Sequence, residues 1–167
     1  EAGHTDLPEL GVRPPMAAGV LAPAARFPGI TPETYLGAAR AARYLAHASD
    51  SPASLAMNQW TLRGEWNRTP EKIGLAGSPG SIVFRFRARD VHLVMGASVD
   101  GASVPFTVLL DGKPPGESHG SDVDATGHGM LREHRLYQII RLSGGSDDHT
   151  VEIRFPGGVD AYAFTFG

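Results

Sequence analysis

The residues with the greatest chemical potential gather in one loop-rich segment of the sequence. They are His119, Asp122, Asp124, His128, Glu133 and His134. Asp122-x-Asp124-x-x-Gly127 has a faint likeness to a calcium loop, because hard cations take several oxygen ligands from flexible backbone. Asp and Gly in this arrangement are also what a turn requires. We expect a turn and no cofactor, and Asp122 and Asp124 are the weak metal candidates.

Catalytic motifs are absent from the sequence, which has no G-x-S-x-G, H-E-x-x-H, P-loop or G-x-G-x-x-G. It has no cysteine, which removes thiol-disulfide chemistry and cysteine ligands for zinc. A hydrolase using His119 or His128 with a nearby acid is the enzymatic alternative, but general acid-base catalysis needs these groups within mutual reach. We predict that this chain is not an enzyme.

Two tryptophans and a row of arginines are the candidates for ligand binding. Indole faces on a β-sandwich can stack on sugar rings, although tryptophan is largely buried on average, so we expect at least one of the two in the core. Arg85, Arg87 and Arg89 alternate along one strand, where a solvated face is the ordinary explanation. The predicted binding residues are Trp60, Trp66, Arg85 and Arg87.

The element that must position these residues is a β-sheet centred on residues 80–115. Ile82, Phe84 and Phe86 alternate with Val83 and the arginines, which is the period of a half-buried strand. Eight to ten such short segments follow one another between turn signals. A single open sheet would leave a second apolar face wet, at Val83, Val94, Val104 and Leu109. The sequence therefore predicts an all-β fold, a two-sheet antiparallel β-sandwich.

Length and composition limit the remaining choices. At 167 residues the chain fits one domain, which we place at residues 31–167. Residues 1–30 are rich in proline and suggest a strap, and we expect at most a short helix within Ala38–Ala46. A net charge of −3 without a concentrated basic patch argues against nucleic acid as a partner. No segment reaches the roughly 18 apolar residues of a membrane span, so we expect no direct membrane insertion.

Six motifs occur in order along the chain: TPETYLG (31–37), W-x-L-x-G-x-W (60–66), FRFRARDVHLVMG (84–96), F-x-V-L-L-D-G-K-P-P-G (106–116), RLYQIIR (135–141) and AYAFTFG (161–167). Together they resemble one known family, the C-terminal domain of DipZ-type proteins. These are membrane-anchored thiol-disulfide electron-transfer proteins related to cytochrome c biogenesis factors. The resemblance covers residues 31–167, and residues 1–6 resemble the tail of the family's thioredoxin-like domain.

The resemblance implies a jelly-roll domain, galactose-binding-like and similar to carbohydrate-binding modules. It would follow an extracytoplasmic or periplasmic thioredoxin-like domain, tethered to the membrane through the parent protein. It also favours an extended strap over a helix at residues 35–48. The predicted function is that of a non-catalytic accessory domain that binds a glycan or cell-envelope polymer. The alternative is a structural domain that docks on the thioredoxin-like neighbour without a ligand of its own.

Overall fold

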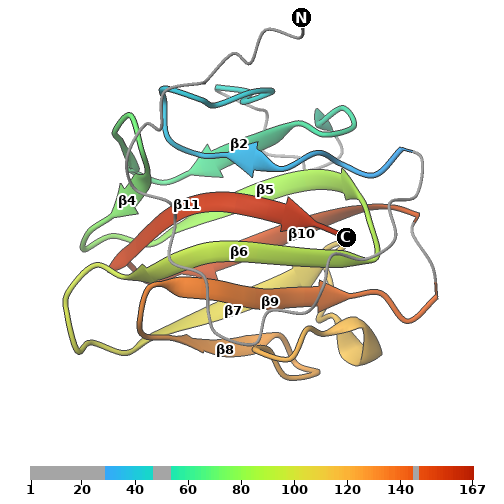
Figure 1. The fold of residues 1–167 in the computed structure, drawn as a ribbon. Helices are drawn as coiled ribbons and strands as arrows, with labels where there is room; N and C mark the ends of the chain where they lie inside the picture. The colour runs from blue at the N-terminus through green and yellow to red at the C-terminus, as the bar shows by residue number, and fades with distance from the viewer. Residues whose placement is uncertain (1–28, 47–53, 145–146) are drawn as a thin grey trace, which may run out of the picture.

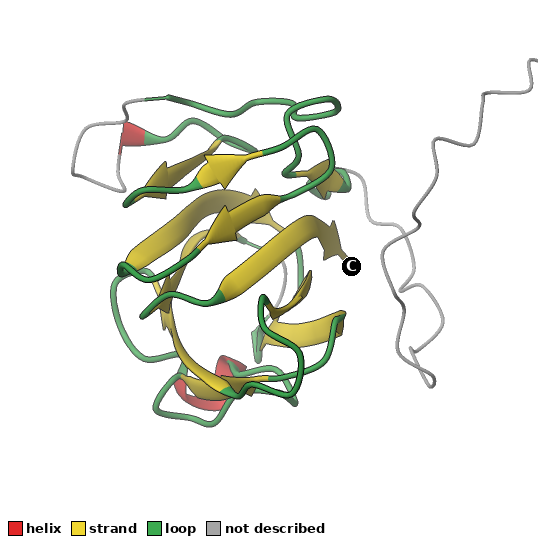
Figure 2. Ribbon diagram, turned by 90° about the vertical axis from the view of Figure 1, so that its left-hand side faces the viewer, coloured by secondary structure: helices red, strands yellow, loops and turns green. Residues whose placement is uncertain are grey.

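The fold consists of two antiparallel sheets that face each other (Figure 1). The computed structural model describes residues 29–46, 54–144 and 147–167. The β6 sheet has the order β3-β4-β11-β6-β9, with β1 also paired to β11, and the β5 sheet has the order β2-β5-β10-β7-β8. Figure 2 shows that strands and loops make up nearly all of the described chain. The predicted two-sheet β-sandwich is confirmed.

The strands of each sheet have the following bounds. The β6 sheet contains β1 (Thr34–Tyr35), β3 (Asn67–Arg68), β4 (Ile73–Leu75), β6 (Asp90–Ala97), β9 (Arg135–Arg141) and β11 (Val159–Phe166). The β5 sheet contains β2 (Trp60–Arg63), β5 (Gly80–Arg87), β7 (Val104–Leu110), β8 (His128–Leu131) and β10 (Asp148–Phe155). A short 3₁₀ turn, η2 (Gly116–Ser118), follows β7.

The core lies between the sheets and follows the alternation of the sequence. Phe84 and Phe86 of β5 are fully buried, and so is Phe164 of β11 on the opposite sheet. The rings of Phe84 and Phe164 meet edge to face with their centroids 5.1 Å apart. Such a pair adds about 1 kcal/mol to the effect of area burial. Period-two patterning therefore placed this part of the core correctly.

The helix expected within Ala38–Ala46 is wrong. These residues form turns and isolated bridges, and their backbone groups bond to residues distant in the sequence. The amide of Ala38 donates to the carbonyl of Thr69, and the amide of Leu45 donates to that of Trp60. Alanine propensity for helix is weak enough for such tertiary hydrogen bonds to override it. The stretch up to residue 46 is not helical, but strand within it is limited to Thr34–Tyr35, and residues 47 and 48 lie outside the described part.

We expected a second sheet to cover the valines at positions 83, 94 and 104, but in the structure it does not cover all of them. The second sheet covers inner faces only, and Val104 packs against that core. Val83 and Val94 belong to the outer faces, because the residues on either side of each belong to the core, yet both are buried. Val83 lies between Thr61 and Glu152 of the neighbouring strands. Packing of two sheets therefore does not explain the burial of these two valines.

The described chain begins and ends at one end of the sandwich, and the loop between β6 and β7 lies at the other end. The amide of Thr31 donates to the carbonyl of Arg87, so the described chain begins beside the end of β5. The amide of Arg89 donates to the carbonyl of Gly167, which places the last residue at the same end. The loop that joins β6 to β7, residues 98–103, lies at the opposite end, because β6 runs away from Arg89.

Candidate binding pocket at the sandwich end

A half-open hollow of about 400 Å³ lies at the end of the sandwich away from Gly167. One wall is the β6–β7 loop, and the other is the turn of residues 132–134 between β8 and β9. Its volume is within the range of about 300–1,000 Å³ that is typical of small-ligand sites. Its lining combines apolar and polar groups, including Val99, Asp100, Ala102, Ser103 and Arg132.

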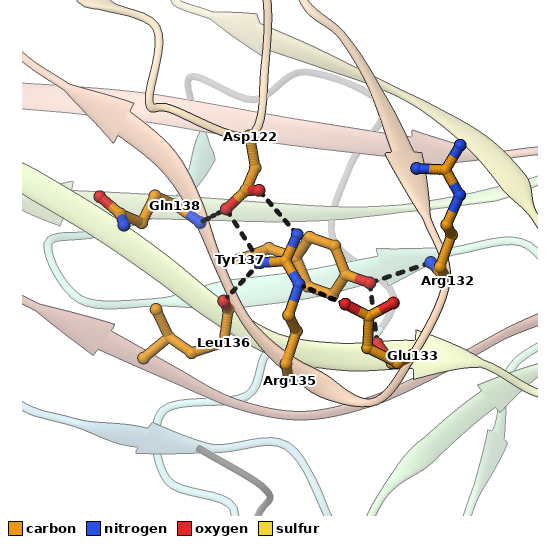
Figure 3. A network of polar contacts seen from close by, with 7 residues as sticks. All are labelled: Asp122, Arg132, Glu133, Arg135, Leu136, Tyr137 and Gln138. Atoms are coloured by element: carbon orange, nitrogen blue, oxygen red, sulfur yellow. Dashed lines mark hydrogen bonds and ion pairs between the residues drawn. The ribbon is translucent and has the colours of Figure 1, made fainter. Parts of the chain in front are cut away.

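An ion pair beside the hollow fixes the start of β9 (Figure 3). Both terminal nitrogens of Arg135 donate to the carboxylate of Asp122, at 2.7 and 3.1 Å. The backbone amide of Gln138 donates to the same carboxylate at 2.8 Å. The third nitrogen of Arg135, Nε, donates to Glu133 at 3.1 Å. A two-pronged Arg–carboxylate pair fixes direction as well as distance, so it holds the Asp122 loop against β9.

The hydroxyl of Tyr137 holds the turn itself. It donates to the carbonyl of Glu133 at 2.8 Å and accepts from the amide of Arg132 at 2.9 Å. The ring of Tyr137 is fully buried, and the guanidinium of Arg135 lies 3.8 Å from its centroid. Because a core side chain bonds to both Arg132 and Glu133, the turn has little freedom to move relative to the sheet.

The side chains of this network keep one protonation state at neutral pH: Asp122 and Arg135 are charged, and Tyr137 is neutral. Burial alone would raise the pKa of Asp122, but hydrogen bonds from Arg135 and from the amide of Gln138 together hold that pKa below its usual value. The hydrogen bond to Asp122 raises the pKa of Arg135 further, against the effect of burial. Burial raises the pKa of the Tyr137 hydroxyl, which therefore keeps its proton. All three groups retain the forms that make these bonds.

His134 lines the hollow, and both of its ring nitrogens form hydrogen bonds within the protein. Its Nε2 lies 2.9 Å from the carbonyl oxygen of Ala97, and its Nδ1 lies 2.9 Å from the hydroxyl of Tyr162. A carbonyl only accepts, so Nε2 donates, and in the neutral ring Nδ1 accepts from the tyrosine. The ring also lies against Gly96, where an added Cβ would be 2.3 Å from it. His134 is thus a wall of the hollow, and neither nitrogen is free to act as a base.

Arg132 is the cation that lines the hollow, beside the carboxylates of Asp100 and Glu133. Its side chain is exposed, and its guanidinium makes no hydrogen bond or ion pair with any residue in the described part of the chain. Figure 3 shows the guanidinium pointing away from the network that holds its backbone. Five donors in a rigid plane suit a carboxylate or phosphate. The hollow therefore has a cation without a hydrogen-bond partner on a turn whose backbone is fixed, next to the charge of Glu133.

The predicted binding residues do not include this turn, and the structure does not bring them together. Trp60 is fully buried, and its Nε1 donates to the carbonyl of Ala42 at 2.9 Å, so its faces are not a platform. Trp66 is half-buried, and its Nε1 donates to the carbonyl of Arg63 at 2.9 Å. Because Trp60 belongs to the core, it is removed from the binding site that we propose.

The two arginines of β5 are engaged with protein groups. Arg85 donates to the carbonyl of Leu55 at 2.9 Å, and Arg87 pairs with Asp148 at 2.6 Å. Trp66 lies beside Gly80 at the start of β5, whereas Arg87 ends that strand of eight residues. Seven residue steps of extended chain span about 24 Å. Trp66 and Arg87 are therefore too far apart to contact one small ligand.

The carboxylate oxygens of the two weak metal candidates accept hydrogen bonds from other groups of the protein. Asp122 accepts from Arg135 and Gln138, as described above, and Asp124 accepts from the amides of Thr126 and His128, both at 3.0 Å. In residues 29–46, 54–144 and 147–167, no group of three His, Asp or Glu side chains is arranged to hold a metal ion. His119 and His128, named for the enzymatic alternative, do not line the hollow.

Sequence reasoning missed Arg132, Val99 and Ser103. A signal was available in Arg132-Glu133-His134-Arg135, a run of charged and polar residues between two apolar segments. A second signal was Val99, an apolar residue that precedes Asp100 and Gly101 in a turn. Val99 is 67% exposed. Their meeting at one hollow depends on how β6, β8 and β9 are arranged, which neither local signal contains.

Residues 31–167 match the protein family described as "Thioredoxin like C-terminal domain". The chain belongs to this family. Among curated proteins, it is similar to Protein DipZ of Mycobacterium bovis and to Protein DipZ of Mycobacterium tuberculosis, with 28% identity over 146 residues in each case. The match covers 83% of this chain and 19% of each relative, so the chain spans about a fifth of their length. The resemblance to a DipZ-type C-terminal domain is confirmed.

Solved structures similar to this thioredoxin-like C-terminal domain include two family two carbohydrate esterases. The enzyme from Cellvibrio japonicus has 13% identity and a TM-score of 0.49, over 64% of this chain and 30% of the esterase. The enzyme from Clostridium thermocellum, in complex with cellohexaose, has 14% identity and a TM-score of 0.45, over 65% and 31%. The likeness is one of fold alone.

Proposed function

We propose that this thioredoxin-like C-terminal domain is the non-catalytic binding module of a DipZ-type protein. Its ligand is a glycan or cell-envelope polymer, and the hollow beside Arg132 binds an anionic group of that polymer. The parent protein carries the thiol-disulfide chemistry on an extracytoplasmic thioredoxin-like domain anchored to the membrane. This chain has no cysteine, and no helix in its described part is long and apolar enough to cross a membrane. The domain thus localises its parent on the envelope.

The observation that carries the proposal is the free guanidinium of Arg132 on a turn fixed by Tyr137. Because the backbone of Arg132 is fixed before binding, only its side chain has to be ordered when a ligand arrives, which reduces the entropic cost of binding. The hollow also lies at the end of the sandwich away from Thr31 and Gly167. A polymer can therefore reach it without displacing a domain attached at the other end.

Replacing Arg132 by glutamine is expected to abolish most of the binding. Charge-assisted hydrogen bonds contribute about 1.5–3 kcal/mol, so affinity should fall about tenfold or more. The measurement is affinity electrophoresis of the full chain against carboxylated, phosphorylated and neutral envelope polysaccharides. Arg43→Gln is the matched control, because Arg43 is also exposed and its loss changes the net charge equally. Absence of retardation on every polysaccharide, or equal loss in both variants, would count against the proposal.

Protein docking at the same end is the second candidate function. Val99 is 67% exposed and Met130 is 41% exposed, and these are the large apolar side chains that the described residues expose. Met130 precedes Arg132 by two residues, and Met and Arg are both enriched at protein interfaces. This arrangement suits a domain that shapes the substrate groove of its thioredoxin-like neighbour.

For this second function, reductase rates of the two-domain protein should fall when Val99 is replaced by aspartate. The buried charge would oppose docking, whereas Thr107→Asp on the outer face of β7 should leave the rate unchanged. Equal rates for both variants and for the unaltered protein would exclude docking through this surface. Retained polysaccharide binding in the Val99 variant would then favour the first function.

A further inference from the structure

The lining of the hollow carries charges of both signs on opposite walls. Arg132 lies in the turn between β8 and β9, and Asp100 lies in the loop between β6 and β7. Both side chains are exposed, and neither charged group forms a hydrogen bond or ion pair within the part of the chain that the structure describes. Opposite charges that do not pair are separated by more than the roughly 4 Å of an ion pair. A small ligand group can therefore lie between them.

Hydrogen bonds fix the spacing of the two walls at their base. The amide of Ala97, the last residue of β6, donates to the carbonyl of Arg132 at 2.8 Å. The carbonyl of Ala97 accepts from Nε2 of His134 at 2.9 Å. The amide of the next residue, Ser98, donates to the carbonyl of Gly158 at 2.9 Å. The loop and the turn are thus joined to each other and to the sheet before a ligand arrives.

Asp100 lies at the tip of the loop, where the backbone makes a tight turn. The amide of Ala102 donates to the carbonyl of Val99 at 3.1 Å. Gly101, the third residue of this turn, has a φ of +78°, a left-handed conformation that suits glycine. The backbone of Asp100 is therefore held in place, as is that of Arg132, and binding has to order only the two side chains.

Carboxylates outnumber guanidiniums around the hollow. Among the described residues that line it, Asp100 and Glu133 are carboxylates and Arg132 is a guanidinium. The ion pair of Asp122 and Arg135 behind the turn adds one charge of each sign, so one negative charge remains. Figure 3 shows the carboxylate of Glu133 turned toward Arg135. A purely anionic ligand group would meet Arg132 but would also be repelled by Asp100, whereas a group with both charges would have a partner for each.

We propose that the hollow binds a zwitterionic group, an amino acid end whose carboxylate pairs with Arg132 and whose ammonium pairs with Asp100. This inference rests on the proposed function, because it names the chemical group of the glycan or envelope polymer that the hollow recognises. The carboxylate accepts from the planar guanidinium, and the ammonium donates to the carboxylate of Asp100. Val99 and Ala102 lie in the same lining and provide apolar contacts for the carbon atoms of the group.

Replacing Asp100 by asparagine gives opposite results for the two kinds of ligand group. With a zwitterionic group, the full chain should bind the polymer about threefold to fivefold more weakly, because the ammonium loses an exposed ion pair. With a purely anionic group, the variant should bind more tightly, because a repelling charge is removed. Asp147→Asn is the matched control, since Asp147 is also exposed and lies at the other end of the sandwich, where its neighbour Asp148 pairs with Arg87.

The measurement is affinity electrophoresis on an envelope polysaccharide that carries free amino acid ends, before and after its amines are acetylated. Acetylation removes the ammonium and keeps the carboxylate. It should weaken retardation of the unaltered chain and should remove the weakening caused by Asp100→Asn. Circular dichroism confirms that the variants are folded. Retardation that is unchanged or stronger in Asp100→Asn would overturn the zwitterionic group.

Small probes measure the same chemistry without a polymer. In NMR titrations of the full chain, alanine should shift the amide signals of residues 99–103 and 132–134. N-acetylalanine and alaninamide each keep one of the two charges and should give shifts at least threefold smaller at equal concentration. Phosphoethanolamine represents the other source of a zwitterion, a lipid headgroup. Larger shifts with phosphoethanolamine than with alanine would overturn the assignment to an amino acid end.

Failure of this inference can be distinguished from failure of the proposed function. Polymer binding that requires Arg132 but does not weaken in Asp100→Asn would overturn the zwitterionic group and leave the anion-binding module intact. Shifts with alanine that Asp100→Asn removes, without retardation by any polymer, would support the zwitterionic group and overturn the polymer-binding function. Absence of both the shifts and the retardation would overturn both.

Discussion

Replacing Asp122 by alanine should lower the free energy of unfolding by about 2–3 kcal/mol, the size expected when one partner of a partly buried ion pair is removed. The side chains of Asp122 and Arg135 are only 20% and 25% exposed, so water replaces the lost partner poorly. The variant also leaves the amide of Gln138 without its acceptor. Urea unfolding of the two proteins measures the difference.

The pH dependence of this difference separates the ion pair from a packing effect. The folded-state pKa of Asp122 is depressed, so its contribution is fully present above the ordinary value of 3.8 and is lost as pH falls through the lower folded value. The Asp122→Ala variant should therefore approach the unaltered protein in stability at strongly acid pH and differ most at pH 7.

Asp124→Asn is the control for the Asp122 variant, because Asp124 is exposed and an amide oxygen can still accept from the turn. Its stability should change little at either pH. A stability loss in Asp122→Ala that does not vary with pH would show that the charge of Asp122 is unimportant. Weaker polymer binding in the same variant, at a pH where it is folded, is expected because the Arg132 turn adjoins the loosened strand.

The strands were predictable from the sequence because their signal is local. Phe84 and Phe86 alternate with Arg85 and Arg87, and any half-buried strand must show that pattern. The stretch of residues 38–46 was predicted less well from the residues alone. Its alanines favour a helix locally, but the backbone groups of Ala38 and Leu45 bond to residues far away in the sequence, Thr69 and Trp60. Nothing within residues 38–46 encodes those partners.

The candidate site depended still more on long-range arrangement. Asp122 attracted attention as a metal ligand because carboxylates followed by glycine are a local signal, whereas its partner Arg135 is thirteen residues away. Arg132 looks like one surface cation among many until Tyr137 is seen to hold its backbone. The tryptophans show the converse, since a residue type suited to stacking on sugars is equally suited to the core.

Trp60→Ala should be the most destabilising single change considered for this chain, at about 3–5 kcal/mol. Trp60 is fully buried, its ring lies 4.6 Å from that of Tyr44, and its backbone and indole both bond to the strap. Removing the indole leaves a large cavity where residues 42–45 meet β2. Thermal or urea unfolding, followed by circular dichroism, measures the loss.

Trp60→Phe distinguishes a core residue from a binding residue more directly. It keeps most of the apolar volume and removes the bond to Ala42, so stability should fall by less than in the alanine variant, by about 1–3 kcal/mol. Polysaccharide binding by the folded variant should equal that of the unaltered chain, because the hollow beside Arg132 does not include Trp60. Loss of binding with unchanged stability would show that Trp60 contacts the ligand. Residues 42–45 would then have to move away from Trp60 to expose it. The same measurement on Trp66→Phe extends the test to the second tryptophan, which is only half-buried but lies beside β5 rather than at the hollow.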